Sequence, residues 1–155
     1  MTPGAVRVVP DRLDSDVGTA LVAALLDELR SRYGAEDPDE PAPDELAPPG
    51  GVFVIAWTGD EPVGCGGLRA YDGEIGELKR MYVTPPARRS GVARAVLAEL
   101  ERVARGLGYG RLRLETGIRQ PEAIALYESS GYEPIAPYGI YGDAPLSRCF
   151  EKTLD

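Results

Sequence analysis

The stretch that decides the fold is Val83-Thr84-Pro85-Pro86-Ala87-Arg88-Arg89-Ser90-Gly91-Val92-Ala93-Arg94. A strand-like run ends at its first residue, two prolines turn the chain, and a helical stripe of apolar residues begins near its end. The small residues Gly91 and Ala93 leave the first main-chain N–H groups of that helix unobstructed. Those groups have no partner within the helix and lie at the positive end of its dipole. With three arginines beside them they predict a diphosphate site, and the alternative is a solvated basic turn that merely begins a helix.

The elements around this loop predict an α/β fold. Apolar residues recur at helical spacing from Gly18 to Tyr33 and from Val92 to Leu107, and a third helix lies between Pro121 and Gly131. Apolar runs bounded by turns predict strands at Val6–Pro10, Val52–Trp57, Pro62–Leu68, Ile75–Val83, 111–116, Tyr132–Ile135 and Leu146–Leu154. Because a helix joins 75–83 to 111–116, these two strands should run parallel. We expect one domain over 1–155: a mixed, mostly antiparallel sheet with a central parallel strand–helix–strand unit, flanked by helices.

The composition excludes several classes of protein. The 155 residues are 43% hydrophobic and 27% charged, as in an ordinary globular protein. No apolar run approaches the roughly 20 residues of a membrane helix, and the N-terminus does not resemble a secretory signal, so we expect a cytoplasmic protein with no membrane partner. The net charge of −8 argues against a nucleic-acid partner. The chain has no histidine, and Cys65 and Cys149 form no metal-binding pattern, so we expect neither a catalytic triad, a disulfide nor a metal site.

Two sequence motifs resemble those of the GNAT superfamily of acyl-CoA-dependent N-acyltransferases. Arg88-Arg89-Ser90-Gly91-Val92-Ala93 matches the family pattern Gln/Arg-x-x-Gly-x-Gly/Ala. The later piece from Glu122 to Tyr132 resembles the second pattern, Ala-x-x-Leu-Tyr-x-x-x-Gly-Phe/Tyr. The two motifs stand in the family order, and the predicted sheet extends the resemblance over the whole chain.

The resemblance implies roles for named residues. The main chain of Met81, Tyr82 and Val83 would bind the pantetheine arm, and an N–H group near Val83 would polarise the acetyl carbonyl. The strand at 111–116 would splay away from that at 75–83 to make room for the thioester.

Tyr127 would protonate the departing thiolate, with a core tyrosine as the alternative, and Ala123 would leave room for the cofactor. Gln120 stands where many members have Asn, and Arg89 where many have Gly. The pyrophosphate would be held by the loop residues Arg88, Arg89, Ser90, Gly91, Val92, Ala93 and Arg94.

A carboxylate should remove the proton of the attacking amine, because the chain has no histidine. Glu77 is the first candidate, since several relatives carry a Glu base in this strand, and Glu115 is the reserve. In a regular strand Glu77, Lys79 and Met81 share one face. The alternative is a surface Glu77 beside Lys79.

For three further segments the sequence leaves two interpretations open. Residues 34–50, here called the acidic loop, hold five prolines and six acids, which predicts a mobile loop unable to bury much apolar surface. As a lid it would favour a cationic amine, and otherwise it is only solvated. The glycines of Gly64-Cys65-Gly66-Gly67 indicate a bulge or a close approach of main chains. Tyr138 and Tyr141 either border the acceptor site or only pack their own loop.

The resemblance implies an N-acetyltransferase that moves the acetyl group of its cosubstrate acetyl-CoA directly to a primary amine of a small molecule or peptide. A non-catalytic CoA-binding sensor or interaction module is the main alternative, and it predicts binding without turnover. A nucleotide-binding α/β domain is a third interpretation, against which the lack of a lysine after the loop counts. The acceptor, the use of other acyl groups and the formation of a homodimer, common among relatives, stay open.

Overall fold

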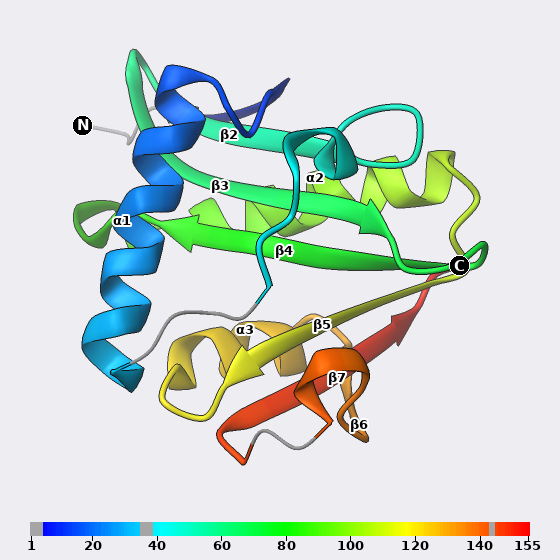
Figure 1. The fold of residues 1–155 in the computed structure, drawn as a ribbon. Coiled ribbons are helices and arrows are strands. Elements are labelled where there is room, and N and C mark those ends of the chain that lie inside the picture. Colours follow the sequence, from blue (N-terminus) through cyan, green and yellow to red (C-terminus); the bar gives the residue numbers. More distant parts are fainter. Residues whose placement is uncertain (1–4, 35–38, 143–144) are drawn as a thin grey trace.

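The apolar runs of the sequence pair into one sheet. The computed structural model describes residues 5–34, 39–142 and 145–155, and this part forms a seven-stranded sheet of order β1-β2-β3-β4-β5-β7-β6 (Figure 1). All neighbouring strands are antiparallel except β4 and β5, which are parallel as predicted. The strands are β1 (Val6–Asp11), β2 (Val52–Thr58), β3 (Glu61–Ala70), β4 (Ile75–Val83), β5 (Arg111–Gly117), β6 (Glu133–Ile135) and β7 (Ser147–Thr153).

Helices cover both faces of the sheet. Figure 1 shows α1 (Asp16–Tyr33) crossing one face, with α2 (Val92–Gly106) on the other. The third predicted helix is α3 (Pro121–Ser129), and short 3-10 turns occupy Pro43–Leu46 (η1), Pro85–Ala87 (η2) and Gly139–Tyr141 (η3). Within the described ranges, no helix combines the length and apolar character needed to cross a bilayer. The predicted mixed α/β architecture is therefore confirmed.

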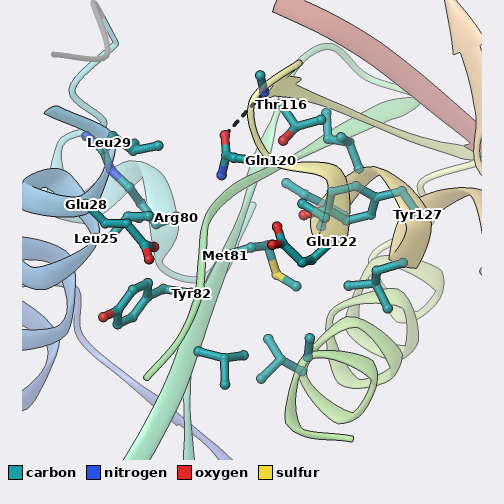
Figure 2. Close-up of a pocket in the computed structure, with 18 of the residues that line it drawn as sticks. Leu25, Glu28, Leu29, Arg80, Met81, Tyr82, Thr116, Gln120, Glu122 and Tyr127 are labelled. Atoms are coloured by element: carbon teal, nitrogen blue, oxygen red, sulfur yellow. Dashed lines mark hydrogen bonds between the residues drawn. The ribbon is translucent and has the colours of Figure 1, made fainter. Parts of the chain in front are cut away.

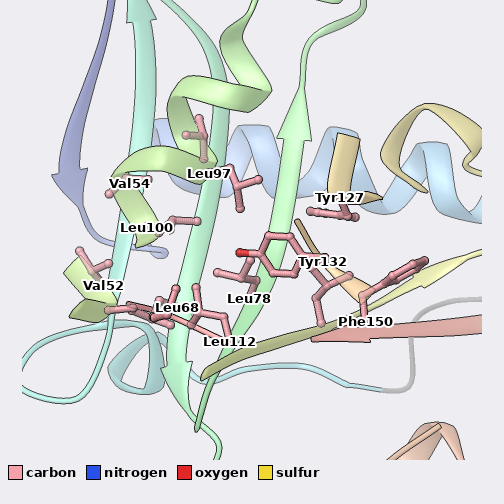
Figure 3. Packing of buried hydrophobic residues seen from close by; sticks show 14 of the residues in the cluster. Val52, Val54, Leu68, Leu78, Leu97, Leu100, Leu112, Tyr127, Tyr132 and Phe150 are labelled. Carbon is pink, nitrogen blue, oxygen red and sulfur yellow. The ribbon is translucent and has the colours of Figure 1, made fainter. Parts of the chain in front are cut away.

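The core is divided by the sheet. On the α2 face, Leu97 and Leu100 of the helix pack with Leu68, Leu78 and Leu112 of three strands (Figure 3). On the α1 face, a smaller cluster joins the helix to η1 and to residues of β2, β3 and β4. Its members are Leu21, Leu25, Leu46, Phe53, Ile55, Cys65 and Tyr82. Alternation along β2 and β3 thus feeds two apolar layers, which is why these strands are buried on both sides.

The sheet opens between its two parallel strands. The pairing of β4 with β5 covers three residue pairs, from Ile75↔Arg111 to Glu77↔Arg113. Beyond Glu77 the two strands diverge towards their C-terminal ends, as Figure 1 shows. This confirms the predicted splay, and it leaves one edge of the second half of β4 without a neighbouring strand among the described residues.

A bulge in β4 overturns one prediction about side-chain direction. Arg80 has φ 58°, and the register with β3 shifts between Cys65 and Gly67, so that two β4 residues face Gly66. A Cβ on Gly64 would lie 2.8 Å from the Tyr82 carbonyl oxygen, which confirms the predicted close approach of main chains, and a Cβ on Gly66 would lie 2.7 Å from the Met81 sulfur. After the bulge Met81 packs on the α2 face, whereas Glu77 and Lys79 point to the α1 face. The prediction that these three share one face is therefore wrong, because it assumed a regular strand.

The acidic loop also differs from its prediction over the part described. Residues 35–38 lie outside the described residues, but from Asp39 onward the chain packs against β3 and β4. Leu46 is fully buried and fills the space beside Gly67, where a Cβ would stand 2.8 Å from it. The expectation that the loop buries little apolar surface is wrong at Leu46, while its mobility stays a prediction.

Candidate active site

A cavity of about 1160 Å³ lies where β4 and β5 separate. Its walls come from α1, the second half of β4, the start of α2, the end of β5 and α3. Figure 2 shows residues of α1 with Arg80 and Tyr82 on one side of the cavity, and Glu122 and Tyr127 on the other. Segments far apart in the sequence thus form one site.

The N-terminus of α2 opens into this cavity as predicted. Gly91 is the N-cap with φ 86°, no side chain caps the helix, and the Ala95 N–H donates to the Gly91 carbonyl. Val92, Ala93 and Arg94 of the first turn line the cavity. The N–H groups of this first turn have no partner inside the helix, so they can bind an anion.

The side chains of the loop form more hydrogen bonds with the rest of the protein than the motif predicts. The Arg88 guanidinium donates to the Val83 carbonyl at 3.0 Å and to Glu28 of α1 at 2.9 Å, and it lies over the Tyr82 ring. Arg88 therefore fixes the loop to β4 and α1, although it still lines the cavity. Two further side chains of the loop are also bonded within the protein. Arg94 donates to the Ser129 hydroxyl at 2.8 Å, and Ser90 donates to the Ala87 carbonyl and lies outside the cavity lining.

Tyr127 lies at the cavity wall, where the second motif predicts it. It is 5% exposed, and its ring meets the edge of Tyr132 with the centroids 5.7 Å apart. Burial, with a smaller effect of the Glu115 charge, raises the pKa of the Tyr127 phenol well above its usual range. The phenol therefore keeps its proton at neutral pH. Ala123, one turn earlier, also lines the cavity.

Gln120 is held by neighbours at the end of β5. Its Oε1 accepts from the Gly117 N–H at 3.3 Å and from the Tyr33 hydroxyl at 3.2 Å. The Arg119 N–H donates to the same hydroxyl at 3.1 Å, and Arg32 and Arg119 exchange guanidinium-to-carbonyl bonds of 2.9 and 2.8 Å. We call this contact between the end of α1 and residues 117–120 the strap. It joins the two sides of the splayed sheet beside the cavity.

The two candidate bases lie in different places. Glu77 is 2% exposed, accepts from Arg69 at 2.8 Å and from the Tyr138 hydroxyl at 2.7 Å, and is outside the cavity lining. Glu115 lines the cavity and is half-buried. Of the two tyrosines expected either to border the acceptor site or to pack their loop, Tyr138 stacks with Arg113, which favours packing. The side chain of Tyr141 lies outside the described residues.

Sequence reasoning missed the contribution of α1 and of Arg80 to the cavity wall. Glu28 and Arg32 lie four residues apart on one helix, so they share a face, and this spacing was the available signal. Arg80 gave no signal, because its direction depends on the bulge opposite Gly66.

A mixed sheet that parts between two parallel strands, with a helix N-terminus and a buried tyrosine at the opening, is the architecture of an acyl-CoA-dependent acetyltransferase. The family model described as "Acetyltransferase (GNAT) family" matches residues 19–132, and the chain belongs to this family.

Individual relatives agree with the family. The "IAA acetyltransferase" of Azospirillum brasilense is 42% identical over 110 residues, which cover 70% of this chain and 72% of that protein. The uncharacterized N-acetyltransferase YsnE of Bacillus subtilis (strain 168) is 34% identical over 148 residues, covering 92% and 98%. A Klebsiella pneumoniae structure described as an acyl-CoA N-acyltransferase superposes with a TM-score of 0.82 at 32% identity, covering 97% and 98% of the two chains.

Proposed function

We propose that the chain transfers the acetyl group of acetyl-CoA directly to a primary amine of a small molecule or peptide. One observation carries this proposal: within the described residues, the start of α2, the edge of β4 beyond its last pair with β5, and Tyr127 all open on one cavity. The residues present fit a CoA-type cosubstrate, because the cavity combines the main-chain N–H groups of a helix N-terminus, which suit a diphosphate, with a wall that is apolar over much of its length.

Main-chain groups do most of the binding in this proposal. The N–H groups between Arg89 and Arg94 hold the pyrophosphate, and the free edge of β4 at 81–83 binds the pantetheine arm as a further strand would. Bound acetyl-CoA supplies an activated thioester. An N–H group near Val83 is directed at the carbonyl oxygen of that thioester, where negative charge develops during attack by the amine.

Tyr127 serves as the proton donor to the departing sulfur. Its raised pKa keeps the phenol protonated over the pH range in which an amine can react, and its position on α3 directs it into the cavity. The proton of the attacking amine goes to a carboxylate, directly or through water. Glu115 is better placed than Glu77 for this step, because it lines the cavity whereas Glu77 lies outside the cavity lining.

The proposal is tested by measuring CoA release over a panel of amines with wild type and Tyr127→Phe. We expect the variant to lose at least about tenfold in kcat while calorimetry shows an unchanged affinity for CoA, because the lost hydroxyl acts only in the transition state. Tyr109→Phe is the matched control, since Tyr109 is buried outside the cavity and bonds the Gly50 carbonyl. CoA binding without turnover of any amine would instead favour the non-catalytic module.

A further inference from the structure

Tyr132 is the last residue of the second sequence motif, and the proposed function gives it no role. It is 2% exposed and lies behind the cavity, outside the lining. Its ring packs edge to face against the Tyr127 ring at 67°, and its main-chain N–H donates to the Tyr127 carbonyl at 3.0 Å. Figure 3 shows the two rings next to each other in the core. Tyr132 is therefore a direct neighbour of the proposed proton donor, although it is not part of the cavity wall.

The position of the Tyr127 phenol depends on how its ring is packed. Within the described residues, the Tyr127 hydroxyl forms no hydrogen bond that would hold it in place. In the same part of the chain, Tyr132 is the aromatic ring in contact with it. A group that gives up a proton in a transition state must be held close to its acceptor, because proton transfer depends steeply on distance. Whatever fixes the Tyr132 ring therefore also restricts the phenol of Tyr127.

The Tyr132 ring is itself fixed by a buried ion pair. Its hydroxyl donates to Glu101 of α2 at 2.8 Å, and Lys152 of β7 donates to both oxygens of that carboxylate at 3.1 and 3.2 Å. Glu101 is only 8% exposed, so its charge requires such partners. Burial, followed by the charge and the hydrogen bond of Glu101, raises the pKa of the Tyr132 phenol, so the hydroxyl keeps the proton that it donates. Like Tyr132, Glu101 and Lys152 lie outside the cavity lining.

We propose that Tyr132 is a positioning residue: held by Glu101 and Lys152, it fixes the place of the Tyr127 phenol at the cavity wall. This inference rests on the proposed role of Tyr127 as proton donor. A displacement of about 1 Å can cost a reacting group on the order of a hundredfold in rate. The family pattern accepts Phe or Tyr at this position, and a Phe would fill the same space without a bond to Glu101. The hydroxyl is therefore what connects the ring to the ion pair.

A double-mutant cycle tests whether Tyr132 acts through Tyr127. In the CoA-release assay we expect Tyr132→Phe to lower kcat about three- to tenfold and to leave the KM for acetyl-CoA within about twofold of wild type. In a Tyr127→Phe background the same change should have no further effect on kcat, because the phenol that it positions is absent. Tyr109→Phe is the control, since it removes the hydroxyl of another buried tyrosine, bonded to the Gly50 carbonyl, and should leave kcat unchanged in both backgrounds.

Two further variants separate positioning from folding. Glu101→Gln keeps an acceptor oxygen for the Tyr132 hydroxyl, so it should retain most of the kcat that Tyr132→Phe loses. The double variant Glu101→Leu with Tyr132→Phe replaces both bonded partners by apolar groups, which costs little stability, so it should fold even where Tyr132→Phe alone does not and should show the same loss of kcat. The Lys152 side chain is 23% exposed, so its ammonium can then turn to water. An unchanged kcat in both Tyr132 variants, or an equal loss in the wild-type and Tyr127→Phe backgrounds, would overturn the inference.

An NMR measurement that needs no turnover separates this inference from the proposed function. Tyrosine labelled with carbon-13 at Cζ reports on each phenol, and the Tyr127 signal is identified by its loss in Tyr127→Phe. In CoA-saturated protein we expect this signal to be single and sharp in wild type and Tyr109→Phe, and broadened or split in Tyr132→Phe, because the phenol then occupies several positions. That result supports the inference even if no amine is acetylated, in which case only the proposed function fails. Turnover of amines with an unchanged Tyr127 signal in Tyr132→Phe leaves the proposed function standing and removes the inference.

Discussion

Glu77 and Glu115 lie on neighbouring strands, but only Glu115 lines the cavity. Glu77 ends the paired part of β4 and is bonded by Arg69 and Tyr138, while Glu115 stands on β5 beyond the last β4–β5 pair, at the cavity. The sequence put Glu77 on the correct strand but could not show these partners, since Tyr138 is 61 residues away. A buried carboxylate with two donors stabilises the fold more readily than it accepts a proton from a substrate.

Exchange of each carboxylate for its amide should therefore give opposite results. We expect Glu115→Gln to lower kcat at least about tenfold. Glu77→Gln should cost about 1–3 kcal/mol of unfolding free energy, because a charge-assisted bond to Arg69 is weakened, and should keep most of the turnover. Urea unfolding and CoA release measure the two effects. Full stability of Glu77→Gln together with loss of turnover would instead identify Glu77 as the base.

Among the elements, α2 depends on the conformation of the glycine before it. Gly91 has φ 86°, and a Cβ at this position would meet no neighbouring atom within 4 Å, so its requirement is conformational and not steric. The motif predicted this glycine for the access it gives to the N–H groups. The structure adds that a residue with a Cβ would strain the turn into the helix, at about 1–2 kcal/mol.

Replacement of this glycine should weaken cosubstrate binding. We expect Gly91→Ala to raise the Kd for CoA several-fold and to destabilise the protein by about 1 kcal/mol, as the donors of the first turn shift. Gly106→Ala at the other end of α2 is the matched control, because its Cβ would meet nothing within 4 Å and its φ is not positive. It should leave the Kd unchanged and add about 0.4–1 kcal/mol of stability. Equal Kd values for the two variants would contradict a role for the α2 terminus.

The acidic loop gives a second test at the level of elements. Leu46→Ala should lower the free energy of unfolding by about 2–5 kcal/mol, because it empties a fully buried site beside Gly67. Leu107→Ala, at a side chain 41% exposed, should change stability far less. Chemical denaturation compares them. If Leu46→Ala unfolded like wild type, Leu46 would not anchor the loop to β3 and the prediction of a mobile loop would be supported.

Local patterns predicted the elements well and their irregularities poorly. The stripe from Val92 to Leu107 and the alternation in 111–116 are set by nearby residues, so α2 and β5 appear close to their predicted bounds. The bulge at Arg80, the burial of Leu46 and the pairing of Arg88 with Glu28 depend on partners far along the chain. No periodicity in a single sequence reports such contacts, so the candidate site was predicted in its main-chain part and missed in its α1 wall.

At the scale of the whole molecule, the sheet consists of two parts that meet at β4 and β5. The strap provides a second connection between them, because Tyr33 of α1 bonds Gln120 and the Arg119 N–H near the end of β5. A Cβ on Gly117 would lie 1.9 Å from the Tyr33 hydroxyl, so the tyrosine sits directly on the main chain of β5. The width of the cavity is therefore fixed by the β4–β5 pairing at one end and by the strap at the other.

Removal of the Tyr33 hydroxyl should loosen this second connection. We expect Tyr33→Phe to cost about 1–2 kcal/mol of stability and to speed hydrogen exchange at residues 117–120 more than at β2 or β3. Native-state exchange followed by mass spectrometry measures this. Tyr71→Phe, on an exposed tyrosine of the turn between β3 and β4, is the control. Uniform acceleration over the sheet would argue that the strap only adds general stability.

The three-residue seam between β4 and β5 has a practical consequence for handling the protein. A cosubstrate bound in the opening beyond that seam would bind only the folded chain. A hundredfold excess of cosubstrate over its Kd should therefore stabilise the fold by about 2.7 kcal/mol and raise the melting temperature. Purified protein without bound CoA should therefore be less stable than the complex, and storage with CoA should slow its loss by unfolding.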